Sequence, residues 1–223
     1  MEQGKSNPDT GLSVQWLGHA CFLVTSSDGT RVLTDPFDES VGYPVPAVQA
    51  DVVSVSHSHF DHSSVSVVKG SPEVVRNAGE SNAAGISFLG VSSYHDDARG
   101  GKRGQNVIFV WEMDGMRLAH LGDLGHVLTD DQVAKMGKVD ILFIPVGGSF
   151  TIDAKQATKT VEQLLPKLVF PMHYKTDAIN FPIADVDEFL AGKDNVEGIK
   201  SNSLVVRELP EQTKIVVLKY SDQ

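Results

Sequence analysis

The sequence predicts a mixed α/β fold, and three observations lead to this prediction. Short runs rich in β-branched and aromatic residues open the chain, later strand patterns alternate with apolar residues at helical spacing, and turn signals separate these segments. No internal repeat, low-complexity segment or linker rich in Pro and Gly divides the 223 residues. A chain of this length can build one substantial core. We therefore expect a single domain over residues 1–223, with residues 1–11 as a flexible N-terminal segment.

The expected strands begin with a hairpin region. Residues 14–17, 21–25 and 31–34 are short β-rich runs, and Ser27-Asp28-Gly29 between the last two is typical of a hairpin turn. The run Val52–Ser56 is typical of a buried strand. Such a strand would present the polar residues that follow it at its C-terminal end.

Strand patterns continue through the middle and end of the chain. Residues 86–91, 107–112 and 116–120 have β-rich composition, and Asp114-Gly115 joins the last two as a strong hairpin signal. The remaining expected strands cover residues 141–145, 168–170, 203–208 and 214–220.

Three helices are expected between these strands. From Asp153 to Leu165 the apolar residues fall on one helical face, and Pro166 ends the pattern. A second helix begins at Thr129 or Asp130, where either residue can cap it, and runs through Met136 before Gly137. A short third helix is expected over residues 185–190, followed by Gly192.

The densest chemical signal is His57-Ser58-His59-Phe60-Asp61-His62, directly after the expected strand 52–56. Four potential metal ligands fall within six residues, although the chain has only eight His in total. Imidazole and carboxylate groups suit Zn²⁺ and neighbouring divalent ions. Alternate residues of an extended loop point the same way, so His57 and His59 can share one ion while Asp61 and His62 turn toward a second. The competing interpretation is a chance cluster of polar loop residues.

This motif resembles the His-x-His-x-Asp-His signature of the metallo-β-lactamase-fold hydrolases. Similar phrases run along most of the chain: Trp16-Leu17-Gly18-His19, Thr34-Asp35-Pro36, the Gly-Asp-x-Gly-His phrase at 122–126 and Pro171-Met172-His173-Tyr174. The resemblance implies a four-layer αββα sandwich. It also implies that His57, His59 and His95 bind one ion, that Asp61, His62 and His173 bind the other, and that Asp123 bridges them.

Within that family, the chain is most similar to the single-domain branch of metal-dependent hydrolases that includes the ascorbate-6-phosphate lactonase-like proteins. Many true β-lactamases have a Cys at the second metal, which this chain lacks, and the flavodiiron branch has a Glu where His59 stands. The added domain of nucleolytic relatives is also absent. These departures argue against antibiotic hydrolysis, diiron redox chemistry and processive nuclease activity.

The resemblance implies a dinuclear metal-dependent hydrolase in which a metal-bridging hydroxide attacks a small, anionic ester or lactone. Asp61, besides binding metal, would hold the hydroxide or accept its proton. Zn²⁺ is the first expectation for the two divalent ions, with Mn²⁺, Fe²⁺ and Ni²⁺ left open. The alternatives are a nuclease-like phosphodiesterase and a non-catalytic, metal-binding regulatory protein.

Four further polar residues have expected roles. His126 is expected to act in catalysis by contacting a substrate oxygen, because it lies near Asp123 on a loop with flanking glycines. For His19 two roles stay open: it could support a metal ligand or contact the substrate. His120, within an apolar strand, is expected to be structural or to support a ligand. For Asp35 two roles also stay open: it could orient a ligand His, or it could be a simple turn carboxylate.

The glycine-rich segment 99–104 lacks the spacing of a phosphate-binding loop. We interpret it as a flexible, basic flap near the site, with Arg99, Lys102 and Arg103 as candidate anion contacts. A solvated hairpin loop is the alternative.

Charge and composition limit the partners. The net charge of −10 argues against a nucleic-acid track, whereas two bound divalent ions would still make the pocket attractive to a small anionic substrate. The single cysteine, Cys21, excludes an internal disulfide and is expected to be buried. Without an apolar leader or membrane span in the sequence, we expect a cytoplasmic location and no membrane partner. The sequence leaves the oligomeric state open.

Overall fold

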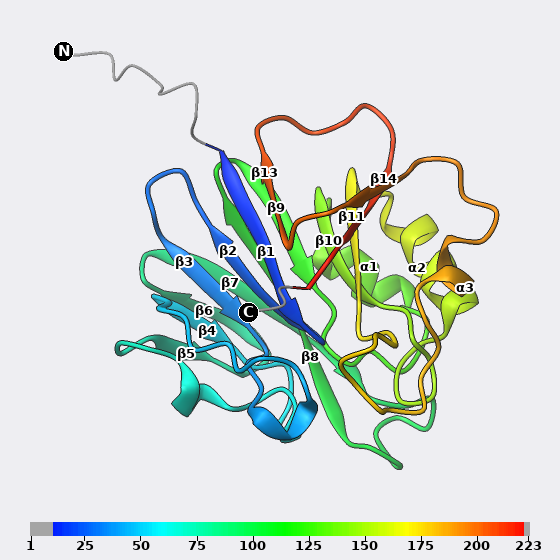
Figure 1. The fold of residues 1–223 in the computed structure, drawn as a ribbon, viewed down its shortest axis with the longest axis horizontal. Helices are drawn as coiled ribbons and strands as arrows, with labels where there is room; N and C mark the ends of the chain where they lie inside the picture. Colours follow the sequence, from blue (N-terminus) through cyan, green and yellow to red (C-terminus); the bar gives the residue numbers. More distant parts are fainter. Residues whose placement is uncertain (1–10, 221–223) are drawn as a thin grey trace.

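The computed structural model describes residues 11–220, which form two β-sheets packed face to face (Figure 1). Within these residues the first sheet has six strands in the order β13-β1-β2-β3-β4-β5. They are β1 (Leu12–Gly18), β2 (Cys21–Thr25), β3 (Arg31–Thr34), β4 (Val52–Ser54), β5 (Glu73–Val75) and β13 (Ser203–Val206). The second sheet has eight strands in the order β12-β14-β11-β10-β9-β8-β7-β6. They are β6 (Gly79–Ala83), β7 (Ile86–Tyr94), β8 (Gln105–Met113), β9 (Met116–His120), β10 (Ile141–Pro145), β11 (Leu168–Met172), β12 (Val196–Ile199) and β14 (Lys214–Leu218).

Strand direction brings several loops to one edge of the molecule. In the second sheet β7, β8 and β9 are successively antiparallel, while β9, β10 and β11 are parallel. The C-terminal ends of β7, β9 and β11 therefore lie at the same edge of this sheet. The loops that follow these three strands carry His95, Asp123 and His173.

The main core lies between the two sheets. Phe22 of β2 packs on Phe143 of β10 with ring centroids 4.5 Å apart, and Phe143 stacks on Phe170 of β11. Side chains of β3 alternate between two cores, because Val32 faces the main core whereas Leu33 belongs to a second cluster with Phe37, Val41, Tyr43 and Ile179. This second cluster covers the outer face of the six-stranded sheet.

Three α-helices flank the eight-stranded sheet (Figure 1). Thr129 caps α1 (Asp130–Met136), and Asp153 caps α2 (Ala154–Leu164) through a capping box with Gln156. The third helix, α3 (Asp187–Leu190), is shorter than the expected 185–190. The second cluster on the other outer face is joined by two 3₁₀ turns, η1 (Glu39–Val41) and η2 (Val65–Val67). The two outer layers are thus unequal.

Every expected strand forms in residues 11–220, and both hairpin turns lie where they were predicted. Some ends shift: β7 continues to Tyr94, beyond the expected end at residue 91. Three strands were not predicted, namely β5, β6 and β12. All three are edge strands with mostly exposed or half-buried residues, so they have no apolar alternation to reveal them.

Three further points concern the N-terminal segment, Cys21 and membrane-spanning helices. The segment expected to be flexible, residues 1–11, lies outside the described residues except for Gly11. Cys21 is buried and unpaired, as expected. No helix in the described part of the chain has the length and apolar character needed to cross a membrane.

Candidate metal centre

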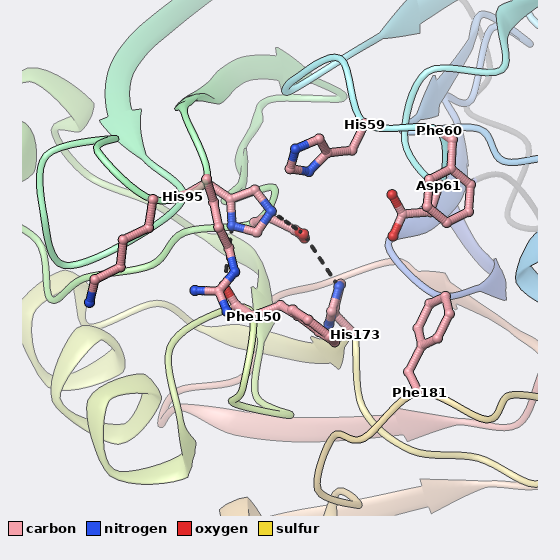
Figure 2. Close-up of a pocket in the computed structure, with 10 residues that line it drawn as sticks. His59, Phe60, Asp61, His95, Phe150, His173 and Phe181 are labelled. Atoms are coloured by element: carbon pink, nitrogen blue, oxygen red, sulfur yellow. Dashed lines mark hydrogen bonds and ion pairs between the residues drawn. The ribbon is translucent and has the colours of Figure 1, made fainter.

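The loop after β4 presents the His-rich motif at the edge where the second sheet's ligand loops also end (Figure 2). The His59 carbonyl accepts a hydrogen bond from the His62 backbone N–H at 3.1 Å, which turns the chain between these residues. Ser63 Oγ also donates to that carbonyl at 2.9 Å. This tight turn lets His59 and Asp61 enter different donor clusters, while the rings of His57 and His62 stay 4.4 Å apart.

His57, His59 and His95 form the first cluster, with one ligand atom from each lying within 4.8 Å of the others. His57 Nε2 is 3.0 Å from His59 Nδ1. The opposite nitrogens are held from outside: His57 Nδ1 lies 2.9 Å from Ser56 Oγ, and His95 Nδ1–H donates to the Phe150 carbonyl at 3.1 Å. The His57 and His95 rings are therefore each oriented with Nε2 free to face the cluster.

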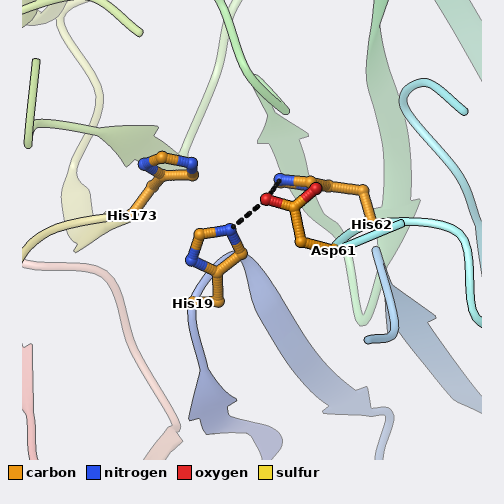
Figure 3. Close-up of side chains that lie close together, drawn as sticks. All are labelled: His19, Asp61, His62 and His173. Carbon is orange, nitrogen blue, oxygen red and sulfur yellow. Dashed lines mark hydrogen bonds and ion pairs between the residues drawn. The ribbon is translucent and has the colours of Figure 1, made fainter. Parts of the chain in front are cut away.

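His19, Asp61, His62 and His173 form the second cluster by the same criterion (Figure 3). His62 Nδ1–H donates to Asp35 Oδ2 at 2.9 Å, which leaves Nε2 facing the cluster. His19 is fully buried, and its ring lies tilted against that of His173 with centroids 4.2 Å apart. Its Nε2–H donates to Asp61 Oδ2 at 3.2 Å. It therefore supports Asp61, the first of the two roles considered for it.

Asp123 connects the two clusters. Its Oδ2 lies 3.0 Å from His95 Nε2 and 3.4 Å from His173 Nε2, and its Oδ1 lies 3.3 Å from His62 Nε2. The Asp123 backbone N–H donates to Asn106 Oδ1 at 3.0 Å. Gly122, at φ +53°, precedes it with no room for a side chain, since a Cβ there would lie 2.4 Å from Ser56 and Asn106 atoms.

The donor groups around Asp123 fit a bound divalent cation. Donor atoms about 2.0–2.1 Å from a tetrahedral ion lie roughly 3.3 Å from one another, close to the separations measured around Asp123. His62 Nε2 and Asp123 Oδ1 are buried 3.3 Å apart without hydrogen-bond geometry, and neither has another hydrogen-bond partner. A buried unpaired group typically costs about 1–3 kcal/mol, a cost that a shared cation would remove.

The electrostatics of the centre favour positive charge. Burial lowers the pKa of His62 by itself, but Asp123 and Asp35 outweigh it and raise that pKa well above the usual value. Burial alone would raise the pKa of Asp123, but His173 and His62 hold it well below the ordinary range. Burial and the nearby His62 lower the pKa of His57 to about 3, so this ring stays neutral and can offer a lone pair.

A buried carboxylate and a buried imidazole support the centre from behind. Asp35 accepts hydrogen bonds from the Ser56 N–H at 2.7 Å, from the Ser56 hydroxyl at 2.6 Å and from His62. Of the two roles considered for Asp35, the structure shows the one that orients a His. His120 donates from Nε2 to the Ala20 carbonyl at 2.8 Å and accepts from the Gly122 N–H at 3.2 Å, which is a structural role.

His126 makes its hydrogen bonds to the backbone around it, and its expected contact with substrate stays a prediction. Its Nδ1–H donates to the Val127 carbonyl at 2.8 Å, and its Nε2 accepts the Tyr94 backbone N–H at 3.3 Å. Both ring nitrogens are therefore used by the backbone. The residues that line the pocket beside Asp123 do not include His126.

A pocket of about 360 Å³ opens onto both clusters (Figure 2). Its lining residues are His59, Phe60, Asp61, His95, Lys102, Arg103, Asp123, Phe150, His173 and Phe181. Of the three candidate anion contacts, Lys102 and Arg103 line the pocket, whereas Arg99 is exposed and outside the lining.

Three residues that shape this pocket, Phe150, Phe181 and Asp96, were not predicted from the sequence. Phe150 and Phe181 come from loops with no motif, and only their aromatic character marks them. Asp96, next to ligand candidate His95, accepts four backbone hydrogen bonds from residues 98–103 and fixes a segment that was expected to be a flexible flap. An Asp before a glycine-rich turn was the available signal.

Comparison with known proteins gives consistent matches. A family model described as "Beta-lactamase superfamily domain" matches residues 13–173. A "UPF0173 metal-dependent hydrolase" of Thermococcus onnurineus is 31% identical over 210 residues, covering 80% of this chain and 90% of the relative.

Two solved structures have folds similar to that of this chain. A Thermotoga maritima protein described as a candidate Zn-dependent hydrolase of the metallo-β-lactamase superfamily has 40% identity and a TM-score of 0.81, with 94% of this chain and 100% of that chain covered. An isothiocyanate hydrolase from Delia radicum gut bacteria has a TM-score of 0.62 at 17% identity, over 80% of this chain and 90% of that one. That likeness concerns the fold alone.

Proposed function

The chain belongs to the β-lactamase superfamily as a metal-dependent hydrolase, and on that premise we propose that it uses two divalent ions to hydrolyse a small, anionic ester or lactone. The expected metallo-β-lactamase-like sandwich of two mixed sheets is confirmed. The likeness to ascorbate-6-phosphate lactonases within the family stays a prediction.

One observation carries the dinuclear proposal: histidines of both donor clusters lie within 3.4 Å of one shared carboxylate, that of the buried Asp123. In this assignment His57, His59 and His95 would hold one ion, and Asp61, His62 and His173 the other. Zn²⁺ is the first candidate, because neutral imidazole and carboxylate donors suit it, with Mn²⁺, Fe²⁺ and Ni²⁺ as alternatives.

When bound, such ions supply a nucleophile at neutral pH, by lowering the pKa of a water, and polarise the scissile carbonyl or phosphoryl group. The protein's own side chains would then accept a proton and orient the ligand rings. His19 holds Asp61 Oδ2, so Oδ1 is the atom available to accept a proton from water. Asp35 keeps the His62 Nδ1–H bond in place and so presents the other ring nitrogen to the centre.

The pocket supports a small substrate with negative charge. A volume of about 360 Å³ matches a small molecule, and Lys102 and Arg103 add positive charge to its lining. A phosphodiester is the second candidate, because a guanidinium also suits phosphate. A non-catalytic, metal-binding regulatory protein is the remaining alternative.

The test combines metal analysis with a substrate panel. Pure protein reconstituted with Zn²⁺ or Mn²⁺ should hold close to two ions per chain and hydrolyse one class among lactones, phosphodiesters and thioesters. Protein that stays at one ion or fewer would contradict the dinuclear assignment. Two ions with no turnover of any class would favour the regulatory alternative.

A further inference from the structure

We propose that the pocket selects a substrate with an anionic group at one end and an apolar, preferably aromatic, group at the other, and that Arg103 binds the anion. This inference rests on the proposed hydrolytic function, which it deepens by naming the substrate class.

Arg103 is the cation available for a ligand. Its guanidinium carbon lies 5.4 Å from the centroid of the Phe150 ring. Within residues 11–220 no carboxylate forms an ion pair with this guanidinium, whereas the Lys102 ammonium is already paired with Asp97 at 2.7 Å. Stacking on an aromatic face orients the guanidinium while leaving its N–H groups free for a carboxylate or phosphate.

The turn that carries Arg103 is held rigidly by Asp96. The Asp96 side chain is only 3% exposed, and its two oxygens accept the backbone N–H groups of Ala98, Gly100, Lys102 and Arg103 at 2.7–2.8 Å. Arg103 therefore need not be ordered when a ligand binds, which reduces the entropic cost of binding.

The wall of the pocket beside Asp61 is apolar, and it continues to Phe150, whose ring Phe181 meets edge-on with centroids 6.5 Å apart. Phe60 is 56% exposed, one of the few large apolar side chains of the described chain that remain open to solvent. Phe181 packs edge-on to His19, with centroids 5.7 Å apart, and both Phe60 and Phe181 lie near Asp61 in Figure 2. An exposed Phe60 and a half-buried Phe181 beside a polar centre are typical of a wall that binds an apolar ligand group.

The two ends have a fixed orientation relative to the metal centre. The Phe150 carbonyl accepts the His95 Nδ1–H, so Arg103 and Phe150 lie beside the first cluster. Phe60 and Phe181 lie beside the second cluster. A substrate that spans both ends would place its reacting bond between them, next to Asp123. Short aryl or alkyl esters that carry a carboxylate or phosphate meet this description.

The experiment measures ligand binding by calorimetry on metal-reconstituted protein, with metal content determined for every variant. The probes are phenyl phosphate, phenylacetate and neutral benzyl alcohol. Arg103→Gln should weaken binding of the anionic probes roughly 10- to 100-fold, the range for losing charge-assisted hydrogen bonds, and leave benzyl alcohol within about 3-fold. Arg99→Gln, in the same turn but outside the pocket lining, is the matched control and should change neither. Phe181→Ala should weaken all three probes.

The outcomes separate the two proposals. A loss confined to phenyl phosphate assigns a phosphate ligand, and a loss confined to phenylacetate assigns a carboxylate. Equal losses for anionic and neutral probes, or no loss in Arg103→Gln at unchanged metal content, would overturn the anion site. A wild-type protein that binds anions through Arg103 but hydrolyses no ester would refute the proposed hydrolysis and leave the anion site standing.

Discussion

Replacing Asp35 by Asn should weaken both the fold and the metal centre. Both Asp35 oxygens accept hydrogen bonds from donors: Oδ1 from the Ser56 N–H, and Oδ2 from the Ser56 hydroxyl and His62 Nδ1–H. An amide has only one acceptor oxygen, so its NH₂ group must face a donor at one of these positions. The side chain is fully buried, and no water can relieve this conflict.

The magnitude follows from the contacts that are lost. A charge-assisted hydrogen bond contributes about 1.5–3 kcal/mol, and a buried donor left unpaired costs about 1–3 kcal/mol, while burying a neutral amide in place of a carboxylate recovers part of this. We expect the free energy of unfolding to fall by about 2–4 kcal/mol. If His62 shifts its proton to Nε2 to accommodate the amide, metal affinity should also fall, roughly 10- to 100-fold.

Two measurements test this prediction. Urea denaturation of the metal-free protein gives the change in stability, and competition with a chelator gives the change in metal affinity. The control is Asp153→Asn, because Asn caps a helix about as well as Asp and the α2 cap should survive. A stability loss below about 1 kcal/mol together with unchanged metal affinity would refute the role assigned to Asp35.

Three further predictions concern the centre itself. Asp123→Ala should lower the metal content below two ions per chain and weaken folding of the loaded protein, because two ions would lose their shared carboxylate; elemental analysis and thermal melting measure both effects. Asp61→Asn should reduce turnover at least about 10²-fold, since an amide is a poorer ligand and cannot accept a proton, and full activity in a steady-state assay would remove Asp61 from its role. His126→Ala should retain both ions and keep kcat/KM within about 3-fold, because the ring bonds only to backbone groups; a loss of 10-fold or more would return His126 to the substrate contact first expected from the sequence.

The folded arrangement also explains why His19 lies beside the candidate metal ligands although it comes 42 residues before Asp61. The backbone at His19 is left-handed, at φ +51°, and its carbonyl accepts hydrogen bonds from Trp16 Nε1 at 3.0 Å and from the His173 N–H at 3.2 Å. These contacts join the end of β1 to the loop after β11. They fix the imidazole against Asp61 and His173 and so link the two sheets at the centre.

Local sequence determined much of this protein. The buried strands, both hairpin turns and the capped helices α1 and α2 follow from residue patterns within a few positions, because propensity, capping and turn geometry act over short distances. The His57–His62 motif likewise marks its chemistry within one loop. The resemblance then extended the candidate ligands to His95, Asp123 and His173.

Tertiary structure decided what those patterns leave open. Side-chain direction depends on packing against distant segments, and the sequence near Asp123 did not indicate that the His126 ring bonds to the backbone of Tyr94 and Val127. The edge strands carry no apolar alternation, and only their pairing partners define them. The unpaired guanidinium of Arg103 depends on Asp96 and on Phe150, a loop residue 47 positions further along the chain. Long-range contacts of this kind position the charge that we propose selects the substrate.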